Sequence, residues 1–321
     1  MMDTRVQDIH FTSPAHVLKE IEEMRVKGGS PFGRAAAWAF LLAMKQEPID
    51  TYEQLQARVA ELKTALVTLK PTMATIYNTC QLVEEVLCTG SDLTTLKHQI
   101  CRLCERIIEH SFAAVETLAG YGAALIEENQ TVLMHSYSST LMGIFLQAAK
   151  EGKHFRVICT ESRPLRESRN AVNMLRKEDI EVLYLSDASV FAFMPQADLI
   201  LMGADTLCMN GAVANKMGSA QIARLAASCR LPVYFASELF KLDSRTAYGH
   251  LVELERRTKY ELVSTEDFED FEHVEVINQF FDLTPAADIT AIITEYGILH
   301  PAQLSIRWQD LKELLKGGEN A

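Results

Sequence analysis

The sequence predicts an α/β protein with an N-terminal helical domain followed by a Rossmann-like parallel sheet with helices on both faces. In the first third of the chain, apolar residues recur at the spacing of a helix. After Asn129, short apolar runs alternate with amphipathic stretches, which is the pattern of repeated βαβ units. We therefore expect a helical domain over residues 1–128 and an α/β domain over residues 129–321.

The composition of the chain limits which classes of function the protein can have. The 321 residues are 48% hydrophobic and carry a net charge of -12, so we expect a soluble protein that nucleic-acid phosphates would repel. There is no basic and apolar leader, and no apolar run reaches the roughly 18 residues of a membrane span. These features predict a cytoplasmic protein with neither a nucleic-acid nor a membrane partner. The seven cysteines indicate reduced thiols, and Cys101 and Cys104 fit buried helix positions better than a metal or redox site.

Local start signals support the helical reading of the first third. Ser13-Pro14 and Ser30-Pro31 each combine an N-cap residue with a proline suited to the first turn of a helix. Thr51 and Gln54 have the spacing of a capping box, in which each side chain bonds the backbone of the other. A long helix is predicted over 93–125.

Polar residues follow the predicted strands with unusual consistency. The strands are expected at 131–134, 156–160, 181–185, 199–203, 233–236 and 289–293. Ligands of open parallel sheets bind at the carboxyl ends of the strands, so the residues just after each run are candidates for a site. They are His135-Ser136, Glu161-Ser162-Arg163, Ser186-Asp187, Gly203-Ala204-Asp205 and Ser237-Glu238. Together with Lys216, they indicate a small anionic ligand.

Lys216 lies just before an expected helix that carries Ile222 and Leu225. A helix N-terminus next to a lysine is suited to phosphate, but a plain helix start with a solvated lysine is equally compatible with these residues. The chain has no GxGxxG, GxxxxGK[ST], HExxH or GxSxG motif. Dinucleotide binding, P-loop chemistry, zinc proteolysis and α/β-hydrolase activity therefore have no support, and we expect neither cofactor nor metal.

Two segments carry a resemblance to a known family. Residues 203–205 (Gly-Ala-Asp) and 210–218 (Asn-Gly-Ala-Val-Ala-Asn-Lys-Met-Gly) resemble the signature of the initiation-factor-2B-like, sugar-1-phosphate aldose–ketose isomerase family. That family includes methylthioribose-1-phosphate isomerases, ribose-1,5-bisphosphate isomerases and regulatory subunits of translation initiation factor 2B. Further matching segments follow in order along nearly the whole chain: 27–29 with Arg34, 70–72, 161–164, Glu238 with Lys241, 278–285 and 294–298. Within the family, residues 251–255 and 281–285 are most similar to ribose-1,5-bisphosphate isomerases.

The resemblance implies an enzyme that opens a sugar 1-phosphate and converts it to a ketose phosphate. It implies Asp205 as the catalytic acid. It also implies a set of substrate and phosphate ligands, which are Arg163, Asn215, Lys216 and Lys241, with Gly28, Gly29, Arg34 and Lys70 from the helical region. Like its relatives, the chain would form a homodimer or a higher homo-oligomer.

Two positions depart from the pattern of the isomerases. Ser136 stands where they have a cysteine, and a serine hydroxyl is far less acidic than a thiol. Glu167-Ser168 stands about where they have Gln-Gly. The second catalytic role then falls to Ser136, to His135, or to a thiol from Cys159 or Cys208. The alternative is a noncatalytic sensor of a sugar phosphate or nucleotide, or a regulatory subunit like those of initiation factor 2B.

Overall fold

The computed structural model describes residues 9–26 and 28–317, and its internal contacts divide the chain into two compact units. The first unit takes in residues up to 114, together with 238–245 and 305–321, and the second takes in 115–237 and 246–304. The division predicted from the sequence, at residues 128 and 129, assigns 238–245 and 305–321 to the α/β domain.

The first unit is helical, with α1 (Pro14–Glu22), α2 (Gly29–Gln46), α3 (Tyr52–Leu69), α4 (Ala74–Leu87), the first part of α5 (Leu93–Ala124) and most of α10 (Leu304–Lys316). The short strand β8 (Leu242–Asp243) also belongs to it. Thr51 and Gln54 form the predicted capping box at the start of α3. The Ser13 side chain accepts a hydrogen bond from the backbone N–H of His16 and so caps α1, as predicted.

The predicted start of α2 was wrong. The helix begins at Gly29 and its N-cap is Gly28, so Ser30 and Pro31 lie in the first turn. Gly28 has a φ of 94°, a conformation that a side chain would strain, and its carbonyl accepts the N–H of Phe32. The glycine therefore lets the chain turn into the helix without a side-chain cap.

The second unit contains a seven-stranded sheet in the order β11-β10-β7-β4-β1-β2-β3. The strands are β1 (Thr131–Met134), β2 (Arg156–Thr160), β3 (Glu181–Leu185), β4 (Leu199–Gly203), β7 (Val233–Ala236), β10 (Ala291–Thr294) and β11 (Gly297–Leu299). All neighbours pair in parallel except β10 and β11. The six parallel strands, counted along the chain, have the Rossmann order 3-2-1-4-5-6, which confirms the predicted fold class.

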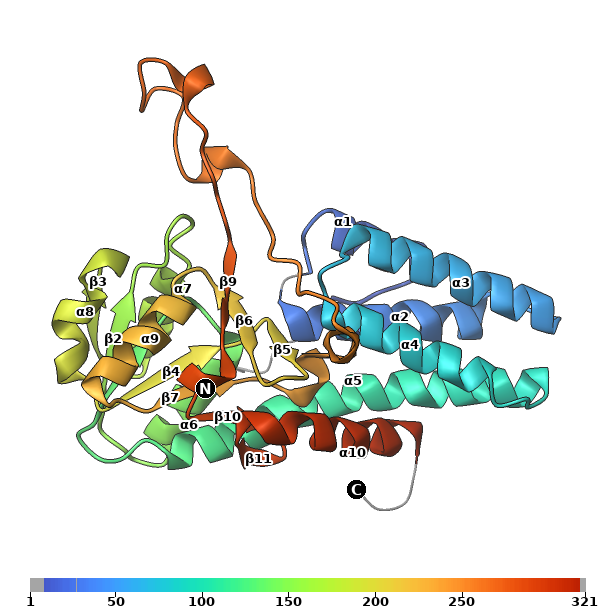
Figure 1. Cartoon of the computed structure of the whole chain (residues 1–321). Helices are drawn as coiled ribbons and strands as arrows, with labels where there is room; N and C mark the ends of the chain where they lie inside the picture. Colours follow the sequence, from blue (N-terminus) through green and yellow to red (C-terminus); the bar gives the residue numbers. More distant parts are fainter. Residues whose placement is uncertain (1–8, 27, 318–321) are drawn as a thin grey trace. The chain divides into compact units, whose positions relative to one another are not determined.

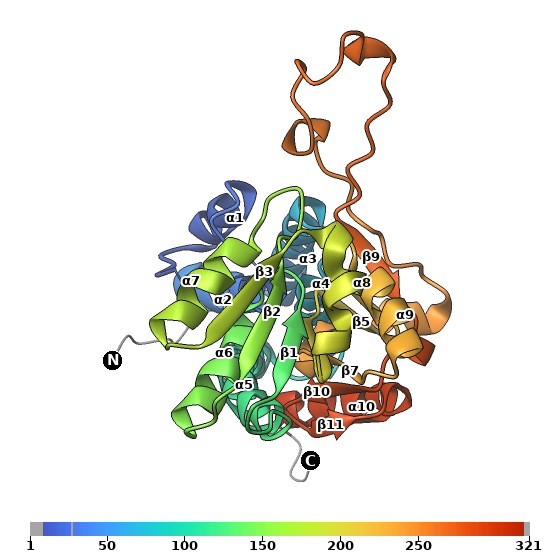
Figure 2. The same ribbon diagram turned by 90° about the vertical axis from the view of Figure 1, so that its left-hand side faces the viewer.

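Helices cover both faces of this sheet (Figure 2). On one face, α6 (Ser139–Lys150), α7 (Ser168–Lys177) and the end of α5 bury an apolar core with alternate residues of the strands, such as Val132 and Met134. On the other face lie α8 (Val190–Phe193) and α9 (Ser219–Cys229). Burial on both faces explains why the strands are continuous apolar runs in the sequence.

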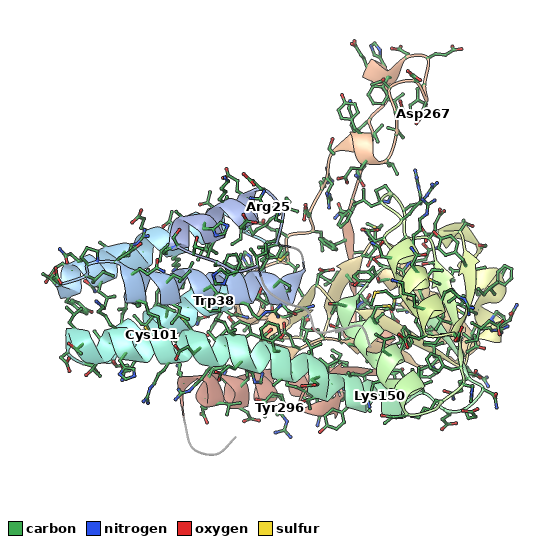
Figure 3. The ribbon with its side chains drawn as sticks, turned by 180° about the vertical axis from the view of Figure 1, so that it is seen from behind. Arg25, Trp38, Cys101, Lys150, Asp267 and Tyr296 are labelled. Atoms are coloured by element: carbon green, nitrogen blue, oxygen red, sulfur yellow. The ribbon has the colours of Figure 1, made fainter. Side chains whose placement is uncertain are left out.

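A second, antiparallel set of strands follows β4. Its strands in the second unit are β5 (Thr206–Cys208), β6 (Val213–Lys216) and β9 (Phe281–Thr284), and β6 pairs with both of the others. Residues 249–280, here called the arm, leave the sheet and return into β9 (Figure 1), and Asp267 lies near the tip of the arm (Figure 3). The base of the arm is held by backbone hydrogen bonds from Arg257 to Asn278 and from Phe280 to Glu255.

None of the helices in the described residues is both long and apolar enough to cross a membrane. Within the same part of the chain, no three His, Cys, Asp or Glu side chains are grouped so that they could hold a metal ion.

Candidate functional site at the strand ends

The strand order places the candidate site between β1 and β4. These two strands are neighbours, and the chain leaves them in opposite directions across the sheet; ligands of such sheets bind at the carboxyl ends of strands that are related in this way. Ser136 follows β1 and Asp205 follows β4, so the fold brings these two predicted residues to the same edge. The backbone N–H of Asp205 donates to the carbonyl of Ala214, which joins the end of β4 to strand β6.

His135 is a buried residue that links three parts of this edge. Its Nε2 lies 2.9 Å from the carbonyl oxygen of Met217, and its Nδ1 lies 2.6 Å from Oγ1 of Thr160. A carbonyl only accepts, so Nε2 carries the proton and Nδ1 accepts the Thr160 hydroxyl. Burial lowers the pKa of His135, which favours the neutral ring. The geometry suits an orienting residue, because both ring nitrogens have partners.

Ser136 is held in an uncommon backbone conformation. Its φ is 67°, and its N–H donates to Oγ of Ser162 at 2.7 Å. Ser162 Oγ also lies 2.8 Å from Oγ of Ser168, and Ser162 itself has a φ of 58°. Non-glycine residues adopt such angles rarely and at a cost, which the surrounding hydrogen bonds must offset. The loops after β1 and β2 are therefore fixed to each other at the candidate site.

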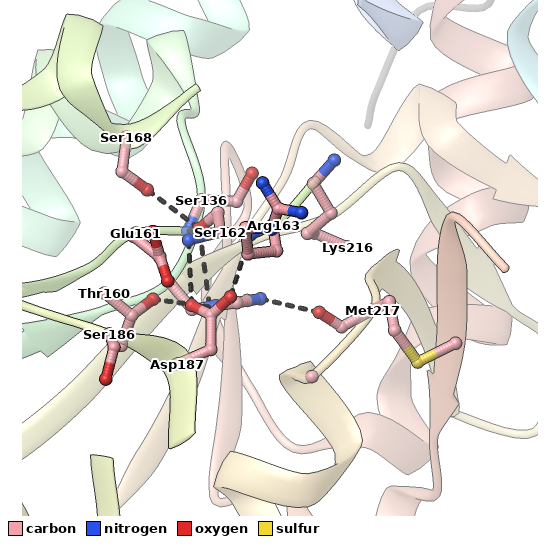
Figure 4. Close-up of polar contacts among 12 residues, drawn as sticks. Ser136, Thr160, Glu161, Ser162, Arg163, Ser168, Ser186, Asp187, Lys216 and Met217 are labelled. Atoms are coloured by element: carbon pink, nitrogen blue, oxygen red, sulfur yellow. Dashed lines mark hydrogen bonds and ion pairs between the residues drawn. The ribbon is translucent and has the colours of Figure 1, made fainter. Parts of the chain in front are cut away.

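Asp187, just after β3, holds the loop after β2. Its two carboxylate oxygens accept the backbone N–H groups of Ser162 and Arg163, each at 2.8 Å (Figure 4). This fixes the backbone of Arg163, whose Nη2 donates to the carbonyl of Leu262 in the arm at 3.1 Å. The predicted phosphate ligand Arg163 thus stands on a loop that β3 and the arm both support.

Lys216 is neither a solvated lysine nor a loop residue, because it lies at the end of β6 and is 3% exposed. Its Nζ lies 2.6 Å from Oε1 of Glu167 and 3.3 Å from the centre of the Phe280 ring. Burial lowers the pKa of Lys216, whereas Glu167 and Asp205 favour the charged form. Its neighbour Asn215 is also buried and donates from Nδ2 to Oγ of Ser219 at 2.8 Å.

The N-terminus of α9, which the sequence offered as a phosphate site, is occupied by a side chain of the protein. The carboxylate of Asp282 on β9 accepts the N–H of Gly218 at 2.7 Å and that of Ala220 at 3.2 Å. Burial nevertheless raises the pKa of Asp282 to about 6, against the effect of these hydrogen bonds. These backbone donors of α9 are thus satisfied from within.

The remaining predicted ligands belong to the first unit. Arg34 is buried, donates from Nη1 to Oγ of Ser111 at 2.9 Å and stacks over Phe112. Ser111 in turn donates to Oε2 of Glu238 at 2.8 Å. Lys70 lies at the end of α3 and donates to the sulfur of Met24.

Three further predicted ligands also belong to the first unit. Gly28 and Gly29 start α2, and Lys241 is buried in a short 3-10 turn. Lys27, which belongs to the same motif as the two glycines, lies outside the described residues.

Cys159 does not offer a replacement thiolate. It lies on β2 inside the apolar core, and burial raises the pKa of its thiol to about 12. Cys208, on β5, is also buried.

The sequence pattern placed Ser162 and Asp187 among the candidates after the strands but assigned them no individual role, and it assigned no site role to Thr160, Glu167 or Asp282. Thr160 is the last residue of β2, and Ser162 and Asp187 follow β2 and β3, which was the available signal. Their partners come from other loops and could not be read from spacing.

The fold and this edge of polar residues define a Rossmann-type α/β protein whose strand ends carry a hydrogen-bonded polar network, in a chain that also contains a helical unit. A family model described as the initiation factor 2 subunit family (IF-2B) matches residues 25–301, and the chain belongs to that family. It is 31% identical to a ribose 1,5-bisphosphate isomerase of Methanocaldococcus jannaschii, over 88% of this chain and 90% of the relative. It is 32% identical to a putative translation initiation factor eIF-2B subunit 2-like protein of Pyrococcus furiosus, over 90% of this chain and 98% of the relative.

A solved structure agrees with this assignment. The translation initiation factor eIF-2B of Pyrococcus horikoshii OT3 superposes with a TM-score of 0.74 at 29% identity, covering 90% of this chain and 98% of that one. The family predicted from the sequence motifs is confirmed.

Proposed function

We propose that the chain is a sugar-phosphate isomerase of the ribose-1,5-bisphosphate type, converting an aldose 1-phosphate to a ketose phosphate with Ser136 in place of the usual cysteine. The observation that carries the proposal is the position of Asp205 just after β4, the strand that neighbours β1, at the edge of the sheet where Ser136 follows β1. The similarity to a protein named ribose 1,5-bisphosphate isomerase, over about nine tenths of both chains, supports it.

The chemistry defines what the site must do. Conversion of an aldose 1-phosphate moves one hydrogen from C2 to C1, breaks the bond between C1 and the ring oxygen, and turns the C2 hydroxyl into a carbonyl. The ring oxygen gains a proton and the C2 hydroxyl loses one, so an acid and a base must both be positioned. Asp205 takes the role of acid and donates its proton to the ring oxygen. As a hydride moves from C2 to C1, the Asp205 carboxylate accepts the proton that the C2 hydroxyl loses, so the residue ends the reaction protonated again. Ser136 orients the substrate hydroxyl as a hydrogen-bond partner, because its own proton is too weakly acidic for a thiolate-like role.

His135 supports this arrangement by holding the end of β1 to the carbonyl of Met217. In the proposal, Arg163, Asn215 and Lys216 bind the substrate. Gly28, Gly29, Arg34, Lys70 and Lys241 stay proposed phosphate ligands of the first unit. The protein works as a homodimer or a higher homo-oligomer.

A second function, noncatalytic binding of a sugar phosphate or nucleotide, is favoured by one specific observation. Ser136 lacks the acidity of a thiol, and the buried Cys159, with a pKa of about 12, cannot supply a thiolate. A protein of this kind would bind its ligand tightly and return it unchanged, as a sensor or a regulatory subunit would.

Incubation with ribose 1,5-bisphosphate and, in parallel, with ribose 1-phosphate, followed by proton and phosphorus NMR, separates the two functions. An isomerase forms the ribulose phosphate that corresponds to its substrate, and the Asp205→Asn variant loses product formation by at least about a hundredfold, the usual contribution of a positioned acid. Ser136→Cys is expected to increase the rate, because it restores an acidic group. Product formation that persists in Asp205→Asn would remove this mechanism, whereas ligand binding without product in either protein would establish the sensor.

A further inference from the structure

Glu167 and Lys216 form a close ion pair at the candidate site. The Nζ and Oε1 atoms are 2.6 Å apart, and the two side chains are 4% (Lys216) and 26% (Glu167) exposed. The ring of Phe280 covers the ammonium group from a centroid distance of 3.3 Å. The charge of the lysine is thus already neutralised by a residue of the protein itself.

The surroundings of Lys216 favour its pairing with a carboxylate. Burial alone lowers the pKa of Lys216, and the nearby Arg257 acts in the same direction. The hydrogen bond and charge of Glu167 oppose both effects and favour the charged ammonium form, as does the charge of Asp205. A phosphate that approached Lys216 would meet the Glu167 carboxylate beside the ammonium, and like charges at this distance repel strongly in a poorly solvated site.

The second carboxylate oxygen of Glu167 indicates which chemical group would bind beside Lys216 in place of a phosphate. Oε2 is buried, and none of the described residues donates a hydrogen bond to it. A carboxylate oxygen only accepts, and a buried acceptor without a donor is costly. A sugar hydroxyl supplies a donor, whereas a phosphate dianion has none to give.

Arg163 differs from Lys216 in this respect. Among the residues that the structure describes, no carboxylate pairs with its guanidinium group, whose Nη2 donates to the carbonyl of Leu262. Guanidinium groups bind phosphate through two parallel hydrogen bonds. The cationic partner available to a phosphate in this unit is therefore Arg163 and not Lys216.

We propose that Glu167 determines specificity by admitting a sugar hydroxyl, and disfavouring a phosphate, beside Lys216, so that a pentose monophosphate binds more tightly than a pentose bisphosphate. This inference rests on the proposed function, since it takes the ligand to be a sugar phosphate bound at this edge of the sheet. It decides between the two substrate classes, pentose 1-phosphate and pentose 1,5-bisphosphate, that the proposed function leaves open.

Calorimetric titration of the full chain with ribose 1-phosphate, ribose 5-phosphate and ribose 1,5-bisphosphate tests this inference. The unmodified protein is expected to bind one of the monophosphates at least about tenfold more tightly than the bisphosphate, since like charges placed together cost this much or more. Glu167→Gln removes the repulsion and is expected to bring the bisphosphate to equal or tighter binding. Glu151→Gln is the control, because Glu151 also pairs with a lysine, Lys153, but lies before β2 and away from the carboxyl ends of the strands, and it leaves the preference unchanged.

A second variant distinguishes the loss of the charge from misfolding of the Glu167→Gln variant. Glu167→Asp keeps the negative charge and is expected to keep the monophosphate preference. The same preference for the bisphosphate in the unmodified protein and in Glu167→Gln would overturn the inference. Predicted preferences without conversion of any sugar would leave the inference standing and remove only the isomerase, whereas no binding of any of the three compounds would overturn both.

Discussion

Ser136 combines a candidate catalytic position with an unfavourable backbone. Its φ of 67° costs a serine roughly 1 kcal/mol or more relative to an ordinary conformation. The conformation places the hydroxyl at the edge between β1 and β4, while the N–H is tied to Ser162. Strain of this kind persists where the surroundings hold it, and it clusters at functional sites.

We predict that Ser136→Gly separates stability from function. Glycine adopts the positive φ without strain, so the free energy of unfolding is expected to stay equal or to rise by up to about 1 kcal/mol, while turnover is lost with the hydroxyl. Denaturant unfolding and the NMR assay measure the two effects. The control is Ser186→Gly at the end of β3, where φ is -69° and glycine is expected to destabilise the fold by about 0.5–1 kcal/mol. Equal destabilisation by both variants would show that Ser136 is unstrained.

Asp282 predicts a pH dependence of stability. Burial raises its pKa in the folded protein to about 6, above the value of 3.8 for an unperturbed aspartate. The folded state therefore holds the proton more tightly than the unfolded state, so the associated stability is complete below pH 3.8 and is lost as pH rises through 6. The difference in unfolding free energy between the unmodified protein and Asp282→Asn is expected to decrease from pH 4 to pH 7, by at most about 3 kcal/mol. A difference that stays constant over this range would contradict the raised pKa.

At the scale of elements, two glycines of α5 show how closely this helix packs against α6. A Cβ atom placed on Gly122 would lie 2.6 Å from Cγ1 of Ile144 in α6, whereas a Cβ on Gly120 would meet no atom within 4 Å. The two glycines share one helix but only Gly122 is buried, so α5 passes close to α6 at that point.

We predict opposite signs for the two alanine substitutions. Gly120→Ala is expected to raise the free energy of unfolding by up to about 1 kcal/mol through helix propensity. Gly122→Ala gains the same propensity but overpacks Ile144, and a net loss of about 1–2 kcal/mol is expected. Thermal and denaturant unfolding of the two variants measure the difference. Stabilisation by Gly122→Ala would mean that α5 and α6 separate easily.

Elements with a strong local signal were predictable from the sequence. Five of the six predicted strands have the observed bounds, because continuous apolar runs between turn residues mark buried parallel strands. Strand β6 was missed, since its residues include the polar Asn215 and Lys216, which are buried only because β9 and the loop of Glu167 pack on them. Candidate residues at strand ends were predictable in the same way, but their partners depend on tertiary contacts that spacing does not encode.

At the scale of the whole molecule, the chain leaves the α/β unit and enters the helical unit again at 238–245 and at 305–317. No composition change marks either return in the sequence. In the first of them, the Asn78 side chain on α4 donates from Nδ2 to the carbonyls of Phe240, at 2.9 Å, and Leu242, at 2.7 Å. All three residues are buried, so these two hydrogen bonds attach the returning segment to the helices.

We predict that the Asn78 side-chain amide contributes a large part of the free energy that holds residues 238–245 against the helices. Asn78→Ala leaves two buried carbonyls without their donor, and each unsatisfied acceptor costs about 1–3 kcal/mol, so the helical unit is expected to lose about 3 kcal/mol of stability. Gln81→Ala, one turn further along α4, is the control, because its contact with Ser244 is partly exposed and its loss is expected to cost less than about 1 kcal/mol. Hydrogen exchange of residues 238–245, followed by mass spectrometry, measures the local effect beside global unfolding. If exchange of that segment rises in Asn78→Ala and not in Gln81→Ala, the return segment is held from α4. If it rises equally in both, the segment is held by its general burial and not by the amide.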